Sequence, residues 1–477
     1  MRSTFRATLL SAGLLVLLSA CEDTTRPEVA RRDLSPQVTG VDVTITDLGT
    51  LGGSTSFAVA INDLGQVVGS YYDGSSQLRA FLWDGATRDL GTLGGPSSNA
   101  VGINDLGHIV GSASTASGET HAFSWDRTMH DLGTLGGNLS EAVAVNRLGQ
   151  VAGDSRTTSG ATHAFLWDGA MLDLGTLGGP SSNAVGINDL GHVVGNASTV
   201  SGQTHAFLWD GTMRDLGTLG GMTSAATAVN NLGHVVGNAA TASGETHAFL
   251  WDGTMHDLGA LGGSTSLALA VNDQGQVVGY ASTGTGALHA FLWDGAMHDL
   301  DTLGGGISYG VAVNDRGQVA GYSLTSGREW RAFLWDGTMH DLGTLGGQDL
   351  LAIFDVSQRT VAMNNLGQVV GYSFTTSFAR HAVLWTVTAV LPDPVDPLEA
   401  ITAAIEAASL PTGNERGLLA TLDAASQQIG RGNPAAATQL LQALINQVEA
   451  LVRSARLSAE LGQAIIDAAQ AAIAALG

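Results

Sequence analysis

A repeat of 42 residues constrains this chain more than any other feature. The step Asp-Leu-Gly or Asp-Leu-Asp recurs at this spacing along most of the molecule. It starts at Asp47, Asp89, Asp131, Asp173, Asp215, Asp257, Asp299 and Asp341. A fixed period of about 20–50 residues is typical of solenoids and propellers, because each copy is one supersecondary unit that buries its apolar faces against its neighbours.

One period contains the pattern of four short strands. We predict strands over Thr246–Trp251, Met255–Leu258, Leu267–Val271 and Gln276–Tyr280, because each is apolar or alternating and ends at a turn signal. Asp252-Gly253 predicts a tight type I′ hairpin turn, in which both central residues have positive φ. Four antiparallel strands in such a period match the size of one propeller blade.

The two ends of the repeat region are incomplete. Val41–Asp47 aligns with the second strand of the pattern, and His381–Trp385 aligns with the first and has no partner after it. Pairing of these two ends in space would close a ring and remove open sheet edges. We therefore predict an all-β fold over residues 41–387, an eight-bladed β-propeller closed by pairing of its N- and C-terminal strands. A β-solenoid and a fold of two separate sheets remain as alternatives.

Two further residue series have eight members each, which is the basis for the predicted blade count. A tryptophan ends the first strand, and an asparagine opens the second turn. The tryptophans are Trp83, Trp125, Trp167, Trp209, Trp251, Trp293, Trp335 and Trp385, and the asparagines are Asn62, Asn104, Asn146, Asn188, Asn230, Asn272, Asn314 and Asn364.

The recurring motifs resemble the HAF repeat of bacterial extracellular proteins. They are His-Ala-Phe-Leu-Trp-Asp-Gly, Asp-Leu-Gly-Thr-Leu-Gly-Gly and Asn-Asp-Leu-Gly-Gln-Val-Val-Gly, and they cover roughly Val41 to Trp385. The resemblance implies an exported, repeat-built protein and implies no established chemistry. The chain departs from the motif at Arg79 and Arg331, which replace His, and at Val383, which replaces Phe.

The N-terminus reads as a targeting segment. Arg2 and Arg6 precede an apolar run that is too short to span a bilayer, which predicts a signal peptide over residues 1–20. Leu18-Ser19-Ala20-Cys21 resembles a bacterial lipobox, and this resemblance implies cleavage before Cys21 and lipid attachment at its sulfur. The alternative is a plain secretory signal with an incidental cysteine. Residues 21–40 read as a polar tether.

The composition changes after the repeats. Three prolines within residues 388–397 predict a stiff linker, and residues 398–477 are rich in alanine with helical periodicity. Asn433-Pro434 is a typical helix start, and Ser458 is a candidate cap for a last helix. We predict a small bundle of helices. Leu419–Val448 resembles the FIMAH helical module of secreted bacterial proteins, which implies no known activity.

The net charge of the chain limits the classes of partner that it can bind. The chain has a formal net charge of −23, with 13% charged residues. Such a surface repels nucleic acid and anionic lipid, so we expect no nucleic-acid partner and membrane contact only through the lipid at Cys21. We expect a monomer that lies outside the cytoplasm, anchored to the cell envelope or secreted.

Recurring polar residues are candidates for metal or turn chemistry. His121, His163, His205, His247, His289 and His381 form a series that could suggest metal ligands, but we expect each to make a hydrogen bond inside its own blade. The Asn-Asp-Leu-Gly turns lack the alternating carboxylates of an EF-hand calcium loop, so we interpret them as turns stabilised by their own side chains. The sequence thus predicts no metal and no cofactor.

A special site must lie where the repeats differ from one another. Tyr280, Tyr322 and Tyr372 replace the Ser, Asp or Asn of earlier units, and Trp330-Arg331 replaces Thr-His. We interpret these five residues as a candidate stacking surface for sugar or peptide, together with an apolar insertion near residues 349–358. The alternative is that the insertion packs on the helical module or plugs the axis.

These patterns favour a non-enzymatic, surface-anchored protein that acts as a binding or structural scaffold. Its ligand would be an extracellular glycan or protein. A second hypothesis is a secreted enzyme that cleaves polysaccharide or peptide, with its site on the last three blades and with Asp349, Asp355 or Arg331 contributing. Enzymes need an asymmetric set of groups, which near-identical repeats do not provide.

Overall fold

The computed structural model describes residues 40–347, 361–390, 398, 401–402, 404–405, 408, 410–431, 433–454 and 456–476. The contacts divide the chain into two units, Gly40–Val390 and a second unit made of Leu391–Gly477 with Met1–Thr39. The predicted signal peptide, Cys21, nearly all of the tether and the insertion at residues 349–358 lie outside the described residues.

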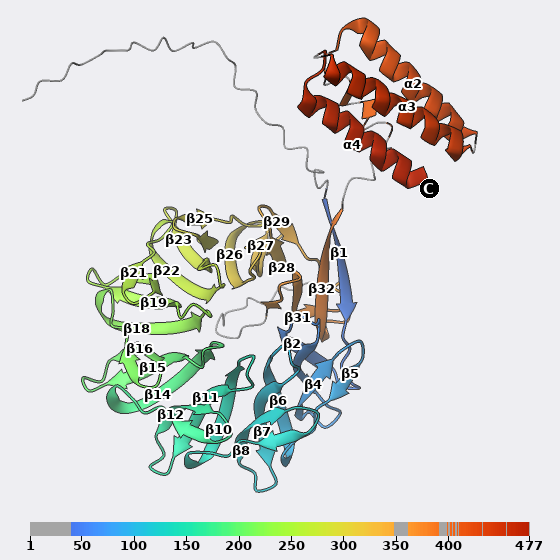
Figure 1. The fold of residues 1–477 in the computed structure, drawn as a ribbon. Helices are drawn as coiled ribbons and strands as arrows, with labels where there is room; N and C mark the ends of the chain where they lie inside the picture. The colour runs from blue at the N-terminus through green and yellow to red at the C-terminus, as the bar shows by residue number, and fades with distance from the viewer. Residues whose placement is uncertain are drawn as a thin grey trace, which may run out of the picture. The chain divides into compact units, whose positions relative to one another are not determined.

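The first unit is mostly β structure, built from repeated four-stranded sheets that resemble propeller blades (Figure 1). One of them consists of β6 (Gly94–Ile103), β7 (Ile109–Thr115), β8 (Thr120–Trp125) and β9 (Met129–Asp131). These strands pair antiparallel in chain order. The predicted strand pattern is therefore present, but the predicted first and second strands are the last two of each sheet.

The other sheets repeat this order. Their strands are β2 (Thr55–Ile61), β3 (Val67–Tyr72), β4 (Leu78–Trp83), β5 (Thr87–Asp89); β10 (Gly136–Val145), β11 (Val151–Thr157), β12 (Thr162–Trp167), β13 (Met171–Asp173); β14 (Gly178–Ile187), β15 (Val193–Thr199), β16 (Thr204–Trp209), β17 (Met213–Asp215); β18 (Gly220–Val229), β19 (Val235–Thr241), β20 (Thr246–Trp251), β21 (Met255–Asp257); β22 (Gly262–Val271), β23 (Val277–Thr283), β24 (Leu288–Trp293), β25 (Met297–Asp299); and β26 (Gly304–Val313), β27 (Val319–Thr325), β28 (Trp330–Trp335), β29 (Met339–Asp341).

The remaining sheet joins the two ends of the repeat region. Its strands are β30 (Ala362–Met363), β31 (Gln368–Phe374), β32 (Arg380–Val390) and β1 (Gly40–Asp47). β1 pairs antiparallel with β32 and places Ile45 opposite Trp385, as the incomplete ends of the repeats predict. β32 extends to Val390, so the first residues of the predicted linker belong to a strand.

Burial between successive sheets explains why the strands are apolar on both faces. One core cluster contains Val68 and Leu82 of one sheet with Ile109 and Phe123 of the next. Val67 and Val68 are adjacent in the chain, point to opposite faces of β3 and are both fully buried. Each sheet is therefore stabilised by apolar contact with the sheet on either side, and no sheet is complete alone.

The predicted type I′ turn is wrong. Trp251 pairs with Met255, so the loop holds three residues, Asp252–Thr254, and not two. Gly253 has a φ of +120°, the only positive φ in this loop. Since a single left-handed residue satisfies the loop, Asp-Gly here marks a longer hairpin connection than the sequence suggests.

The second unit contains helices, as predicted. They are α2 (Thr412–Gly430), α3 (Pro434–Arg453) and α4 (Ala459–Leu476). The Asn433 side chain accepts a hydrogen bond from Ala436 N, and Ser458 Oγ accepts one from Leu461 N. The buried core of this unit includes Leu418, Leu422, Ala425, Leu441, Leu444, Val448, Ile465 and Ala469. None of the helices among the described residues is long and apolar enough to cross a bilayer.

One hairpin carries backbone strain that its counterparts avoid. Arg127 has a φ of +106°, at the position that is glycine in the other Trp-Asp-Gly hairpins. We expect Arg127→Gly to stabilise the protein by roughly 1 kcal/mol, because glycine adopts this φ without a steric cost. Urea unfolding measures the change.

The control for this substitution is the reverse change in another hairpin. Gly85 has a φ of +100°, and a Cβ added there meets nothing within 4 Å. Gly85→Arg should therefore destabilise the protein through φ alone. Equal midpoints for the parent chain and both variants would contradict the account.

Candidate functional site

The Asn-Asp-Leu-Gly turns fold around their first residue. In the turn that follows β2, Asn62 Oδ1 accepts hydrogen bonds from Leu64 N at 3.1 Å and Gln66 N at 2.9 Å. Gly65 completes the turn with a φ of +76° and donates from its backbone N to Asn62 O at 3.0 Å. The side-chain-stabilised turn that the sequence predicts is confirmed.

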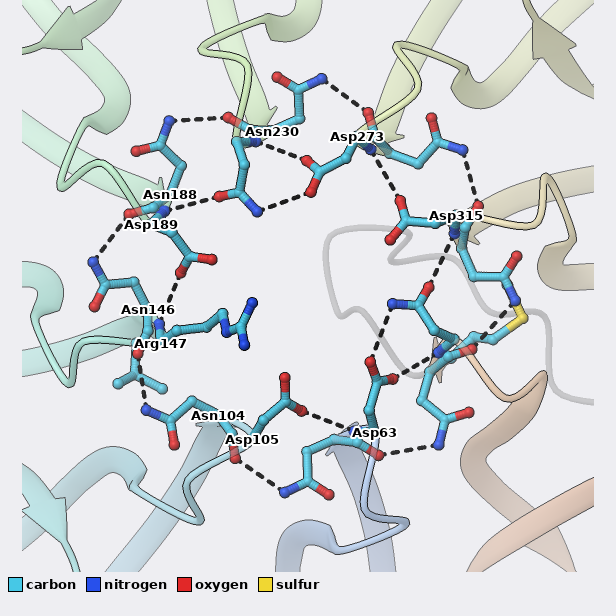
Figure 2. A pocket seen from close by; sticks show the side chains of 18 of the residues that line it. Asp63, Asn104, Asp105, Asn146, Arg147, Asn188, Asp189, Asn230, Asp273 and Asp315 are labelled. Atoms are coloured by element: carbon cyan, nitrogen blue, oxygen red, sulfur yellow. Dashed lines mark hydrogen bonds between the residues drawn. The ribbon is translucent and has the colours of Figure 1, made fainter.

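The same asparagine also binds the next unit. Its Nδ2 donates to the backbone carbonyl oxygen of the asparagine one repeat further on, as Asn62 does to Asn104 at 3.0 Å. The series continues through all eight asparagines at 2.9–3.3 Å and returns to its start with Asn364 Nδ2 donating to Asn62 O at 3.0 Å (Figure 2). We call this series the asparagine ring. All eight side chains are buried, so each lost bond would leave buried polar atoms without partners.

A second series of bonds runs through the residue after each asparagine. Its backbone N donates to a side-chain oxygen of the equivalent residue in the next unit, as Asp63 N does to Asp105 Oδ1 at 3.0 Å. Seven such bonds are present, at 2.8–3.1 Å. The eighth bond, from Asp105 N to the side chain of residue 147, cannot form, because the guanidinium of Arg147 has no hydrogen-bond acceptor.

These turns surround a pocket of about 370 Å³, which we call the central pocket. Besides the asparagine ring, it is lined by Ile, Val or Met from the strand ends and by the second series. The second series consists of Asp63, Asp105, Arg147, Asp189, Asn231, Asp273, Asp315 and Asn365. Five carboxylates thus face one guanidinium, and Figure 2 shows the Arg147 side chain extending into the space inside the ring.

The carboxylates of the central pocket are spaced around it. They come from different turns, and the Oδ1 of each accepts a hydrogen bond from a backbone N–H of the preceding unit. Within the described residues no group of three or more His, Cys, Asp or Glu is arranged to hold a metal ion. The pocket offers hydrogen-bond acceptors and negative charge on a wide, repeated frame.

A larger groove lies between two successive units. Its volume is about 610 Å³, and its lining includes Leu64, Leu106, Trp125, Arg88 and Arg127. Three units further on, the Arg214 guanidinium lies 5.9 Å from the centroid of the Trp251 ring. Arg214 and Trp251 are the counterparts of Arg88 and Trp125. The groove therefore contains an arginine at the same position as the one that lies against Trp251.

The recurring histidines bind inside their own sheets, as predicted. His121 Nδ1 lies 2.9 Å from the Asp131 carboxylate on the neighbouring strand, and the same pair recurs along the repeats. His381 makes the pair with Asp47, at 2.8 Å, and so links β32 to β1. Where arginine replaces histidine the partner is kept, since Arg79 Nη2 lies 3.0 Å from the Asp89 carboxylate.

The aromatic residues singled out in the sequence form contacts within the fold. Tyr280 packs edge-on against Tyr309, with ring centroids 4.9 Å apart, and Tyr309 stacks on Trp330 at 5.8 Å. Trp330 and Tyr322 are only 8% and 7% exposed. The expectation that these aromatic side chains are exposed is wrong for these two, because the face of the strand that bears them is covered by protein.

Four of the five candidate residues nevertheless come together. Tyr322, Trp330, Arg331 and Tyr372 line one hollow with the buried Trp385, and Tyr280 is not among its lining residues. The enclosed volume is about 10 Å³, enough for a single water molecule and too small for a sugar ring. Arg331 is bound by Glu329 and lies 3.8 Å from Asp341.

The tyrosines belong to a series that joins each unit to the next. Ser70 in this series donates to Asn99, Asp154 Oδ1 accepts from Ala184 N at 2.7 Å, and Asn196 Oδ1 accepts from Ala226 N at 2.8 Å. Each partner lies on the first strand of the following sheet. Tyr280 meets Tyr309 at the matching place, so an aromatic contact there replaces a hydrogen bond.

Comparison with known proteins supports the fold alone. No protein-family model matches the chain, and no curated protein does. The propeller domain of the Trilobed protease from Pyrococcus furiosus matches with a TM-score of 0.43 and 12% identity, over 63% of this chain and 99% of that one. A puromycin-hydrolyzing peptidase of Mycobacterium tuberculosis matches with 0.41 and 12%, over 68% and 59%. The Aleuria aurantia lectin, a six-bladed propeller, matches with 0.29 and 12%, over 63% and 100%.

Asn188→Asp tests the asparagine ring separately from the turn. The aspartate keeps the Oδ1 that accepts from Leu190 N and His192 N, and loses the donor to Asn230 O. We expect destabilisation of about 3 kcal/mol, since a buried carboxylate would face a carbonyl oxygen. Asp189→Asn is the control, because Asn231 already occupies the equivalent position, and it should shift the unfolding midpoint little. Equal effects of the two changes would contradict a ring role.

One residue of the inter-unit series, Asp154, is a half-buried acid. Burial raises the pKa of Asp154 to about 7, against the hydrogen bond from Ala184 N, and the nearby Glu141 carboxylate raises it further. Glu141 lies directly opposite Asp154 on the adjacent strand. In the folded protein this carboxyl therefore binds its proton far more tightly than in the unfolded chain.

We expect this group to weaken the fold as pH rises. The pKa of Asp154 is about 7 in the folded protein and 3.8 in the unfolded chain. The contribution of Asp154 to stability is therefore complete below pH 3.8 and is lost as the pH rises from there towards 7. Asp154→Asn should abolish this loss and raise the free energy of unfolding at pH 8 relative to the parent, with little change at acidic pH. Urea titrations across this range measure it.

Asn196 provides the reciprocal test. It occupies the equivalent position and faces Asn183 where Asp154 faces Glu141. Asn196→Asp should create a similar pH dependence of smaller size, because the facing carboxylate is missing. A parent chain whose stability is flat between acidic and alkaline pH would refute the assignment.

Proposed function

We propose that this chain is a closed eight-bladed propeller that acts as a non-enzymatic binding scaffold and presents the central pocket to an extracellular ligand. The observation that carries the proposal is the return of the asparagine ring to its start, with Asn364 bound to Asn62, around an open pocket. The pairing of β1 with β32 supports the same closure.

The chemistry of the central pocket supports binding in preference to catalysis. Equivalent turns supply the same amide and carboxylate groups around it, and their positions are fixed by bonds to neighbouring turns. Catalysis of hydrolysis requires a nucleophile or base and an acid in different surroundings. Hydrogen-bond acceptors at equivalent positions of successive turns instead suit the recognition of a ligand that contacts several turns at once.

The proposal includes export. The sequence of residues 1–20 and the lipobox-like Leu18–Cys21 are the basis for a chain anchored through lipid at Cys21, with the repeats outside the cytoplasm, as the resemblance to HAF-repeat proteins implies. Labelled fatty acid should be incorporated by the full chain and not by Cys21→Ala, and the variant should leave the membrane fraction. Incorporation that survives the substitution would remove the anchor.

The enzyme hypothesis depends on the last three units. Asp349 and Asp355 lie outside the described residues, and Arg331 is engaged by Glu329 beside a hollow that holds about one water. A cleft with two carboxylates separated by about 5–10 Å would be needed for glycoside hydrolysis. The described residues around Arg331 do not supply the space for such a substrate.

Binding and cleavage are separable by one experiment. The purified chain is incubated with arrays of glycans and peptides, and with the same compounds in solution under mass spectrometry. We expect retention of a ligand that is recovered intact, and loss of retention when Asp105→Asn and Asp189→Asn are combined, because these carboxylates face the central pocket. Arg331→Ala is the control and should retain the ligand. Cleavage that disappears with Arg331→Ala would instead establish the enzyme.

A further inference from the structure

The turns around the central pocket expose a series of leucines. Leu64 follows Asp63 in its turn and is 70% exposed. Six units carry leucine at this position, all more than half exposed: Leu64, Leu106, Leu148, Leu190, Leu232 and Leu366. The turn does not require leucine, because Gln274 and Arg316 occupy the position in the other two units and make the same backbone bond to their asparagines.

These leucines belong to consecutive units. Asn364 is bonded to Asn62, so the unit of Leu366 adjoins that of Leu64, and the asparagine ring continues from there through Asn104 to Asn230. We call the six side chains the leucine arc. Gln274 and Arg316 interrupt the series on the remaining side. Leu64 and Leu106 line the same groove with Trp125, so these two neighbours in the arc border one hollow.

The leucine arc borders a pocket of one dominant charge. Each leucine directly follows a residue that lines the central pocket, and these six residues are three aspartates, two asparagines and one arginine. The other two aspartates of the pocket, Asp273 and Asp315, precede Gln274 and Arg316. Figure 2 shows Asp105 and Asp189 on the inner side of the asparagine ring. Exposed apolar side chains in contiguous sets mark binding surfaces, since their exposure to water is unfavourable. The charge beside them selects cations.

Together, these features fit a basic amphipathic ligand. Sugars usually stack on planar aromatic rings, whereas the arc is aliphatic and suits the branched apolar side chains of a polypeptide. A lysine or arginine carried by the same segment would reach the carboxylates of the central pocket. The net charge of −23 attracts such a segment from solution and repels acidic ones.

We propose that the leucine arc and the central pocket form one docking surface for a basic amphipathic peptide segment of a partner protein. Its apolar side chains lie on the leucines, and its Lys or Arg side chains enter the pocket. The inference rests on the proposed binding function and names the ligand class of that same site. Arg147 sits among the arc's units and opposes this charge, so it limits the affinity.

The chain supplies substitutions that mimic its own units. Leu64→Gln with Leu106→Gln copies Gln274, and Asp105→Asn with Asp189→Asn copies Asn231 and Asn365, so both double variants should fold. The probe is a synthetic peptide of repeated Leu-Lys-Lys-Leu, titrated calorimetrically into the full chain. A peptide with Glu in place of Lys measures the contribution of charge to the affinity. A peptide with Ser in place of Leu measures the contribution of the apolar side chains.

We expect each double variant to weaken binding about tenfold or more, because each removes two of the contacts that the site supplies. Arg147→Asn should strengthen binding, since it removes the single opposing charge of the pocket. The control for the leucine variant is Leu172→Gln, because Leu172 is an exposed leucine outside the arc. The control for the aspartate variant combines Asp423→Asn with Asp467→Asn, two exposed acids on α2 and α4. The controls should bind as the parent does.

Unchanged affinity in the leucine double variant would overturn the inference, since binding would then follow from net charge alone. A neutral oligosaccharide that binds and is lost with Asp105→Asn and Asp189→Asn, while the Leu-Lys peptide does not bind, would overturn this inference and leave the proposed function intact. Absence of any ligand whose binding depends on the central pocket would overturn both.

Discussion

The junction between one unit and the next is the interaction on which this structure depends. No single sheet can bury its own two faces, so each relies on its neighbours for apolar cover and for partners to its buried polar atoms. The asparagine amide illustrates this, because its oxygen completes its own turn while its nitrogen satisfies a carbonyl in the next unit. Ser98 does the same between Ala80 N and Gly91 O. Local folding and association of units therefore use the same side chains.

This dual use explains where the repeats vary. A change at Asn or Ser affects two units together, and the asparagine is kept in eight units and the serine in seven. The series of bonds through the residue after the asparagine needs a side-chain oxygen acceptor, which Asp and Asn both provide, and Arg147 shows that one missing bond is tolerated. The third residue of the turn contributes only its backbone. Variation is thus permitted around the central pocket, which is where ligand recognition can differ without loss of the fold.

Much of the fold follows from the sequence because its causes are local. Period, strand pattern and turn residues are each set within a few residues, and the incomplete ends predict the pairing of Ile45 with Trp385. The asparagine ring could not be predicted in the same way. The turn alone accounts for a recurring Asn, so nothing in the sequence indicates that the amide nitrogen reaches a residue 42 positions away. A signal was present, since Ser or Asp would also suit the turn and neither replaces any of the eight.

For the aromatic residues, the sequence predicts a binding surface that the structure does not have. Departure from the repeat at Tyr322 and Trp330 predicts a surface, but both faces of each sheet are covered, so a departure on a middle strand alters a junction and not an exposed face. The exposed leucines do not stand out in the sequence, because they recur with the repeat and so resemble structural residues. Among near-identical units, a residue that recurs although the fold does not need it is a better indication of a binding surface than a residue that departs from the repeat. Leucine at a position where Gln274 folds equally well meets that criterion.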